Sequence, residues 1–212
     1  MRRRCRSPSC GRRLRPPASP ERVRIGLFGG SFDPPHVGHW LAAVDAFEGL
    51  ALDRLDFIPA AQQPLKPEGH RATVDERLAM LAAMVDRDAR FAVNPVEIRR
   101  GGLSFTVDTA TTYRASGPDD ALFLLLGVDA AARLAQWKDP ERLLQLVQLV
   151  VLTRGAEEFV PAGLGRDALV LPTRRVDVSS TEVRQRVSDG RSLRGFVLDA
   201  VAEHIRSTAM YR

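Results

Sequence analysis

The sequence predicts an α/β fold in which a mostly parallel sheet carries helices on both faces. Short apolar runs alternate with segments whose apolar residues recur at helical spacing, and this alternation is typical of such a sheet. The clearest run, at 121–128 (ALFLLLGV), predicts a central strand buried on both sides. Polar or glycine-bearing loops follow several runs, so the carboxyl ends of the strands should meet at one edge, where α/β proteins bind ligands.

Six strands are expected, at residues 23–28, 55–59, 91–98, 121–128, 146–153 and 168–171. Pro95 interrupts the third, because a proline cannot donate to the ladder. Thr73 and Glu76 form a capping box that opens a helix whose apolar face should hold Leu78, Leu81, Ala82 and Val85. Further helices are expected to start near Ser104, ending near Gly117, and near Ser179 and Phe196.

The length and composition of the chain restrict the class of protein. A chain of 212 residues that is 44% apolar can bury one ordinary core. No apolar run approaches the roughly 20 residues that span a bilayer, so we expect no membrane segment. Both cysteines, Cys5 and Cys10, precede the first strand, which argues against a disulfide framework and favours a cytoplasmic protein.

Positive charge is concentrated in residues 1–22, where eight arginines face a single acid, Glu21. The whole chain is +5, so residues 23–212 are close to neutral. The first 22 residues lack periodicity, and we expect a disordered tail before a single domain at 23–212. The tail could bind RNA or an anionic surface. We favour instead upstream sequence from a mis-assigned start codon, or a tail without function, and do not expect nucleic acid as a partner.

The most informative stretch is 29–40 (GGSFDPPHVGHW), between the first strand and an apolar-periodic segment. A glycine turn that feeds a helix leaves free amides and a positive dipole end at one place, which makes a phosphate site. Pro34 and Pro35 stand where the helix should begin, because a missing N–H does no harm there. His36 and His39 are three residues apart, so both side chains should project from the first turn.

Other interpretations of this stretch are less well supported. It lacks both the GxGxxG fingerprint and the GxxxxGK[ST] phosphate loop, which argues against a dehydrogenase. A His-x-x-His pair can ligate zinc, but His70 and His204 do not supply further ligands at a suitable spacing. The sequence therefore predicts no metal held by protein ligands.

A second string, at 178–184 (VSSTEVR), has a similar character. Ser179 or Ser180 can cap a helix while Glu182 reaches back, which is the common capping box. Arg184 lies in the first turn, where a cation opposes the helix dipole unless an anion is present. Hydroxyls, free amides and an arginine together fit a polyphosphate better than an empty cap.

The first string resembles the signature of the HxGH nucleotidyltransferases, and the second is similar to the ISSTxIR motif of that superfamily, with Val178 and Val183 as departures. From about Val23 to Arg212 the chain resembles bacterial nicotinate mononucleotide adenylyltransferases, which implies a Rossmann-like nucleotidyltransferase fold. Further similar strings are 104–109 (SFTVDT), 126–129 (LGVD), Trp137 and 210–212 (MYR). The chain departs from the motifs of that family at Phe105, Gly155 and 63–66 (QPLK).

The resemblance implies transfer of the adenylyl group of ATP to nicotinate mononucleotide, giving nicotinate adenine dinucleotide and pyrophosphate in NAD biosynthesis. The attacking phosphate oxygen is already ionised, so catalysis reduces to positioning and charge stabilisation. Mg²⁺ should accompany ATP with few protein ligands. Adenylyltransferases for nicotinamide mononucleotide or phosphopantetheine are the alternatives, and a homo-oligomer is left open.

The resemblance also implies roles for individual residues. The catalytic set is His36, His39, Lys66 and Arg184. The ATP-binding set is Gly29, Gly30, Ser31, Phe32, His36, His39, Ser179, Ser180, Thr181 and Arg184. The set for nicotinate mononucleotide is Thr106, Asp108, Asp129, Trp137 and Arg154. Trp137 would stack on the pyridine ring and Thr106 would bind its carboxylate, while Asp108 or Asp129 would hold ribose hydroxyls. A structural tryptophan and a simple first-turn acid are the alternatives for Trp137 and Asp108.

Overall fold

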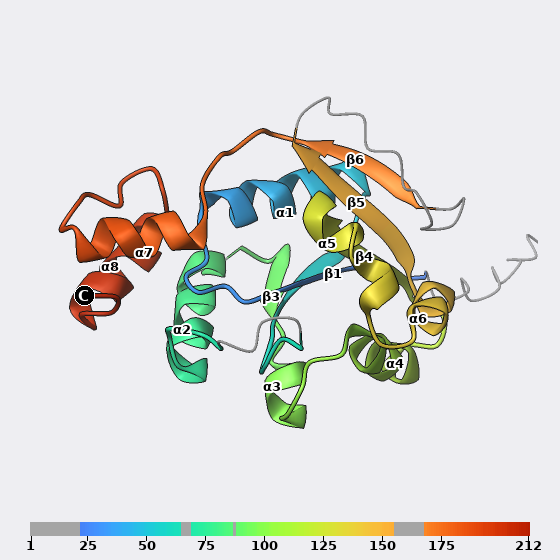
Figure 1. Cartoon of the computed structure of the whole chain (residues 1–212). Helices are drawn as coiled ribbons and strands as arrows, with labels where there is room; N and C mark the ends of the chain where they lie inside the picture. The colour runs from blue at the N-terminus through green and yellow to red at the C-terminus, as the bar shows by residue number, and fades with distance from the viewer. Residues whose placement is uncertain (1–21, 65–68, 87, 155–167) are drawn as a thin grey trace, which may run out of the picture.

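The computed structural model describes residues 22–64, 69–86, 88–154 and 168–212 (Figure 1). Within these ranges six strands form one sheet in the order β3-β2-β1-β4-β5-β6, and every neighbouring pair is parallel. The strands are β1 (Arg24–Gly30), β2 (Arg54–Pro59), β3 (Phe91–Val93), β4 (Ala121–Gly127), β5 (Gln148–Arg154) and β6 (Leu169–Thr173). The strand order reverses between β1 and β4, and such a switch point opens a crevice for ligands at the carboxyl ends.

Helices connect the strands and cover the sheet. They are α1 (Val37–Gly49), α2 (Val74–Val85), α3 (Val96–Arg100), α4 (Thr106–Ser116), α5 (Val128–Ala131), the short 3₁₀ helix η1 (Leu134–Gln136), α6 (Pro140–Leu146), α7 (Ser180–Ser188) and α8 (Asp199–Ser207). Figure 1 shows α7 and α8 next to α2, at the opposite end of the molecule from α4 and α6. None of the described helices is long and apolar enough to cross a membrane.

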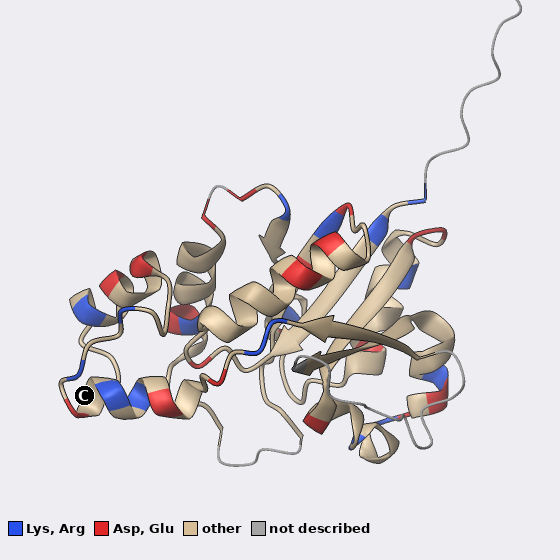
Figure 2. Cartoon of the chain, turned by 90° about the horizontal axis from the view of Figure 1, so that it is seen from above, with Lys and Arg blue, Asp and Glu red and all other residues tan. Residues whose placement is uncertain are grey.

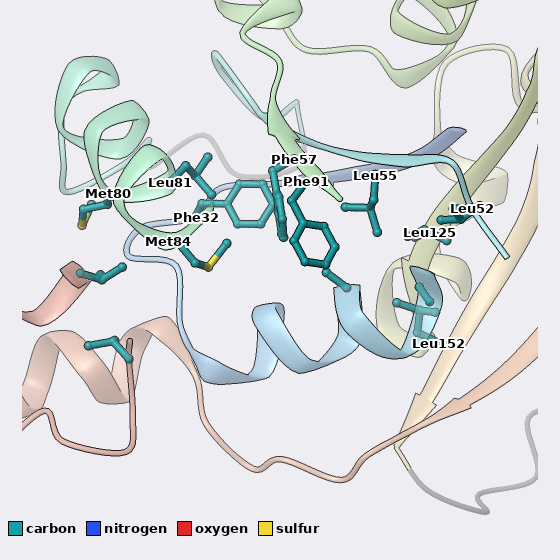
Figure 3. Packing of buried hydrophobic residues seen from close by; sticks show 14 of the residues in the cluster. Phe32, Leu52, Leu55, Phe57, Met80, Leu81, Met84, Phe91, Leu125 and Leu152 are labelled. Carbon is teal, nitrogen blue, oxygen red and sulfur yellow. The ribbon is translucent and has the colours of Figure 1, made fainter. Parts of the chain in front are cut away.

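Successive residues of β4 show that both faces of the sheet are covered. Leu122, Leu124 and Leu126 belong to a buried cluster with α4, α5, η1 and α6. Phe123 and Leu125 belong to a second cluster, formed with α1, α2 and α8 and drawn in part in Figure 3. This alternation confirms the predicted fold class, because a strand buried on both faces needs apolar side chains throughout.

The structure corrects several expected boundaries, including that of the fifth strand, which begins at Gln148 rather than 146 because Leu146 belongs to α6. The third strand ends at Val93 rather than 98, since Pro95 leaves the ladder and becomes the N-cap residue of α3. The first helix begins at Val37 rather than Pro35, because His36 adopts the extended backbone of a cap. The last helix begins at Asp199, because the backbone around Phe196 bonds elsewhere.

The capping box of α2 is confirmed, but its buried face agrees with the expected one only in part: Leu81 is buried as expected. The N–H of Thr73 donates to Oε2 of Glu76 at 2.7 Å, and the N–H of Glu76 donates back to the threonine hydroxyl at 3.3 Å. Ala82 is exposed and Leu78 is half-buried. The residues buried in α2 are Arg77, Met80, Leu81 and Met84. A buried arginine on this face indicates a polar partner within the fold.

Charges of both signs are interspersed over the described helices (Figure 2). This distribution agrees with the nearly neutral balance expected for residues 23–212. Residues 1–21 lie outside the described ranges, so the interpretation of the arginine-rich tail stays a prediction.

Candidate active site

The buried ring of Phe32 packs against the backbone of the turn between β1 and α1. A Cβ atom at Gly30 would lie 2.8 Å from the ring of Phe32, so only glycine fits there. Phe32 is 1% exposed and has a φ of 49°, in the left-handed region that non-glycine residues seldom adopt. Among the described residues, no acceptor takes the backbone N–H of Ser31 or Phe32. These two amides are therefore available to an anion.

His36 and His39 lie against each other at the start of α1. Their ring centroids are 3.7 Å apart, with the planes inclined by 32°. Gly38 allows this arrangement, because a Cβ atom there would lie 3.0 Å from Nδ1 of His36. The backbone N–H of His36 donates to Nδ1 of His39 at 3.2 Å. Since this Nδ1 accepts a hydrogen bond, the neutral ring of His39 carries its proton on Nε2.

The surroundings of His39 favour this neutral form. Burial lowers its pKa well below the ordinary value, and the charge of a protonated His36 lowers the pKa further. The rings of Phe28 and Phe32 approach that of His39 edge-on, with centroids 6.2 and 5.1 Å away. Near neutral pH, His39 thus offers an Nε2–H donor rather than a cation, which suits a hydrogen bond to a phosphoryl oxygen.

The start of α7 is attached directly to the same turn. The hydroxyl of Ser180 donates to the carbonyl oxygen of Pro34 at 2.8 Å, across 146 residues of sequence. Nη1 of Arg184 donates to the carbonyl oxygen of Asp33 at 2.7 Å. Ser179 caps α7 by accepting from the N–H of Glu182 at 3.1 Å. The two strings singled out in the sequence therefore meet at one place.

Part of the expected donor set is already engaged within the protein. The N–H of Val37 donates to the carbonyl of Phe196 at 2.9 Å, and that of His39 donates to His36 O at 2.9 Å. Nη2 of Arg184 donates to the hydroxyl of Thr181 at 3.2 Å. The guanidinium keeps further N–H donors, because Arg has five. An anion here would be held by the turn amides and side chains more than by the amides of α1.

A cavity of about 220 Å³ lies at the carboxyl edge of the sheet. Its walls come from the segment after β2, the start of α4, α5 and the region of η1. The N–H of Ala61 donates to the hydroxyl of Ser104 at 2.8 Å, and the N–H of Ser104 donates to Gln62 O at 2.8 Å, which joins the first two walls. The lining residues are Gln63, Pro64, Ser104, Phe105, Thr106, Ala130, Arg133, Gln136, Trp137 and Lys138.

The residues predicted to bind the mononucleotide are brought together only in part. Thr106 and Trp137 line this cavity, whereas Asp108 and Asp129 do not. The carboxylate of Asp108 is paired with Nζ of Lys138 at 3.0 Å. Asp129 is exposed in α5, directly after β4. Asp129 therefore lies exposed at the carboxyl end of β4, while the carboxylate of Asp108 is already neutralised by Lys138.

Two predicted residues cannot be placed. Lys66 lies outside the described residues, and for Arg154 only the backbone is described, beside Thr173. Conversely, no role was assigned from the sequence to Arg133 in the cavity wall, nor to three residues beside the phosphate turn. These are the buried Asp33 and Arg77 and the half-buried Tyr211, of which Asp33 and Tyr211 lie within quoted strings. A charged residue at an otherwise apolar helix face is the one local signal that could have indicated Arg77.

Within the described ranges, no group of three or more His, Cys, Asp or Glu side chains is arranged to hold a metal ion.

A parallel sheet with the starts of α1 and α7 joined at one turn is the arrangement expected of a nucleotidyltransferase. Residues 27–186 match the cytidylyltransferase-like family. Probable nicotinate-nucleotide adenylyltransferases of Gemmatimonas aurantiaca and Thermus thermophilus are 54% and 43% identical to the chain. Both matches span 90% of this chain, and they cover 93% and 100% of those proteins. The chain therefore belongs to the nicotinate-nucleotide adenylyltransferase family.

Solved structures support the same fold. The nicotinic acid mononucleotide adenylyltransferase of Plasmodium falciparum complexed with NaAD superposes with a TM-score of 0.74 at 15% identity. The match covers 89% of this chain and 97% of that one. At so low an identity the likeness concerns the fold alone.

Proposed function

We propose that the protein transfers the adenylyl group of ATP to nicotinate mononucleotide, giving nicotinate adenine dinucleotide and pyrophosphate in NAD biosynthesis. The observation that carries this proposal is the junction between the β1–α1 turn and α7. The hydrogen bonds of Ser180 to Pro34 and of Arg184 to Asp33 hold two predicted phosphate-binding strings against each other. The family to which the chain belongs has the same activity in its name.

The chemistry at the α-phosphorus needs no proton transfer. An ionised phosphate oxygen of the mononucleotide attacks, a P–O bond to it forms, and the bond to the β-phosphate oxygen breaks. His36 and His39 would donate hydrogen bonds to the transferring phosphoryl group. Gly29, Gly30 and the free amides of Ser31 and Phe32 would surround the phosphates. The site contributes by holding donors where negative charge develops.

The leaving pyrophosphate would be bound by the start of α7. Ser179 and Thr181 would supply hydroxyls and Arg184 a guanidinium next to the dipole end of that helix. Ser180 would contribute its backbone N–H, because its hydroxyl already donates to Pro34. Lys66 would neutralise a substrate phosphate from the loop after β2. Absorbing the growing charge of the leaving group is the contribution expected of these residues.

Mg²⁺ would enter with ATP. The described residues offer no set of three metal-binding side chains, so phosphate oxygens and water would be its main ligands. The bound ion would neutralise phosphate charge. Positioning of the reacting atoms is left to the side chains and amides named above.

The cavity would receive the nicotinate ring. Trp137 would stack on the ring, and the hydroxyl of Thr106 at the start of α4 would bind the carboxylate. Asp129 would hold ribose hydroxyls, while Asp108 is less suited because Lys138 already neutralises its carboxylate. Arg154 would bind the phosphate of the mononucleotide. The proposed location is the cytoplasm, which a cysteine-free body favours.

Pyrophosphate release from ATP with three acceptors tests this function. Nicotinate mononucleotide should be used with the highest kcat/KM, by at least about tenfold over nicotinamide mononucleotide, a difference of about 1.4 kcal/mol. Phosphopantetheine should give no release above background. A preference for either alternative acceptor would reassign the substrate, and no release with any of them would refute the proposed reaction.

A further inference from the structure

Asp33 is the centre of a buried hydrogen-bond network behind the phosphate turn. The residue is 5% exposed. Its carboxylate accepts from the N–H of Arg71 at 2.6 Å, the N–H of Ala72 at 3.1 Å and the hydroxyl of Tyr211 at 2.7 Å. Its backbone carbonyl accepts from Arg184. Tyr211 is 178 residues away, beyond α8, and its hydroxyl ties that segment to the turn.

Arg77 provides a buried positive charge in this network. The side chain is 1% exposed, and its Nη1 donates to the carbonyl oxygen of Ser31 at 3.0 Å. Burial lowers the pKa of Arg77, while Asp33 and Tyr211 act in the opposite direction. A buried guanidinium needs such partners, because an uncompensated buried charge is strongly unfavourable. The network therefore connects α2 to the turn as well.

These hydrogen bonds flank the strained part of the turn. The left-handed Phe32 lies between two carbonyls, on Ser31 and Asp33, that accept from Arg77 and Arg184. A left-handed backbone persists only where the surrounding structure fixes it. Burial and the hydrogen bond to Asp33 raise the pKa of Tyr211, so its hydroxyl stays a donor across the physiological range.

We propose that Tyr211 is a positioning residue for the adenylyl transfer. Through the carboxylate of Asp33, its hydroxyl holds the turn in the conformation that presents the amides of Ser31 and Phe32 and the ring of His39 to the triphosphate. Tyr211 touches no reacting atom. This inference rests on the proposed function, and a displaced turn should reduce turnover while leaving the cavity at Trp137 intact.

Tyr113 offers a matched control. Its hydroxyl donates to Oδ2 of Asp56 at 2.6 Å, and burial raises its pKa as it does that of Tyr211. In both cases a tyrosine hydroxyl donates to an aspartate carboxylate, with Tyr113 buried and Tyr211 half-buried. Tyr113 belongs to α4 and Asp56 to β2, and neither contacts the turn at 31–36 through the hydrogen bonds described. Replacing Tyr113 thus removes the same kind of hydrogen bond without changing the bond between Tyr211 and Asp33.

The test compares the Tyr211→Phe and Tyr113→Phe variants in the full chain. The experiment measures kcat, KM for both substrates and the thermal unfolding temperature. It also measures amide hydrogen exchange of residues 29–39 in the absence of substrate. Tyr211→Phe should lower kcat by about 10- to 100-fold, keep KM for the mononucleotide within about twofold, and speed exchange in 29–39. Tyr113→Phe should lower the unfolding temperature by a similar amount while kcat and that exchange stay within about twofold.

Equal losses of kcat in the two variants, or unchanged kcat and exchange in Tyr211→Phe, would overturn the inference. Hydrogen exchange does not depend on turnover. A wild-type chain that forms no dinucleotide would therefore count against the proposed function, while exchange in 29–39 would still decide the role of Tyr211. Should Tyr211→Phe not fold, Asp33→Asn, which keeps the shape and one acceptor, serves in its place with the same expected changes.

Discussion

The phosphate turn and the pyridine cavity are built in different ways. Buried or half-buried side chains from three distant segments hold the turn through hydrogen bonds, namely those of Arg77, Ser180, Arg184 and Tyr211. The cavity wall contains several exposed polar side chains, including Arg133, Gln136 and Lys138. The contrast follows the chemistry: charge that develops on phosphates needs donors fixed before the reaction. A pyridine ring, by contrast, can be bound by side chains that adjust their conformation on binding.

The largest effect is expected from His39→Ala. Turnover should fall by about 10²- to 10³-fold, because one preorganised donor to the phosphoryl group is lost. KM for nicotinate mononucleotide should change little, because the cavity would bind the pyridine ring independently of the phosphate turn. Pyrophosphate release measures both quantities, and His204→Ala in α8 is the control for loss of a histidine elsewhere. A loss below about threefold with unchanged folding would remove His39 from the catalytic set.

The next effect is expected from Arg184→Lys. Lysine keeps the charge but cannot hold the carbonyl of Asp33 and the hydroxyl of Thr181 as a planar fork does. We expect kcat/KM for ATP to fall by about 10- to 100-fold, with KM for the mononucleotide unchanged. Steady-state kinetics with each substrate varied in turn decide the matter. If the mononucleotide KM rises instead, Arg184 acts on the other half of the site.

A smaller and separate effect is expected at the cavity. Trp137→Ala should raise KM for nicotinate mononucleotide by about tenfold, within the 1–3 kcal/mol that stacking of a base on an aromatic side chain contributes. KM for ATP should stay within about twofold, and Trp137→Phe should recover most of the affinity. Equal changes in both KM values would mean that Trp137 supports the fold rather than the ring.

The smallest effect concerns the stability of the phosphate turn as a function of pH. The pKa of His39 is lowered in the folded state, so the unfolded chain binds the extra proton below the ordinary histidine pKa. Stability is then full above that pKa and is lost as pH falls toward the depressed value. The slope is at most about 1.4 kcal/mol per pH unit for one group. Urea unfolding of wild type and His39→Gln measures it, and an identical pH dependence in both would contradict the assignment.

The two halves also differ in how far the sequence could predict them. The parallel sheet and the two phosphate strings could be predicted, because apolar runs, glycine turns and caps act over a few residues. Helix starts were less accessible: proline favours the first helical position, yet His36 takes the cap and α1 begins after both prolines. The network of Asp33 could not be predicted, because nothing in the string at 210–212 indicates that Tyr211 pairs with a residue 178 positions away.

The buried face of α2 shows the same limit. Apolar spacing favoured Leu78 and Ala82 for the core, since charged side chains are seldom buried. The fold rotates the helix so that Arg77 is inside, where Asp33 compensates its charge. A pattern of hydrophobicity cannot anticipate a buried cation whose partner comes from another part of the chain.

The most direct measurement is a crystal structure of the protein with a non-hydrolysable ATP analogue. One triphosphate should lie within about 3 Å of both Nε2 of His39 and the donors of Ser180 or Arg184, because the two helix starts share one nucleotide. A triphosphate that contacts one helix start while the other lies more than about 3.5 Å away without a bridging water would contradict the shared site.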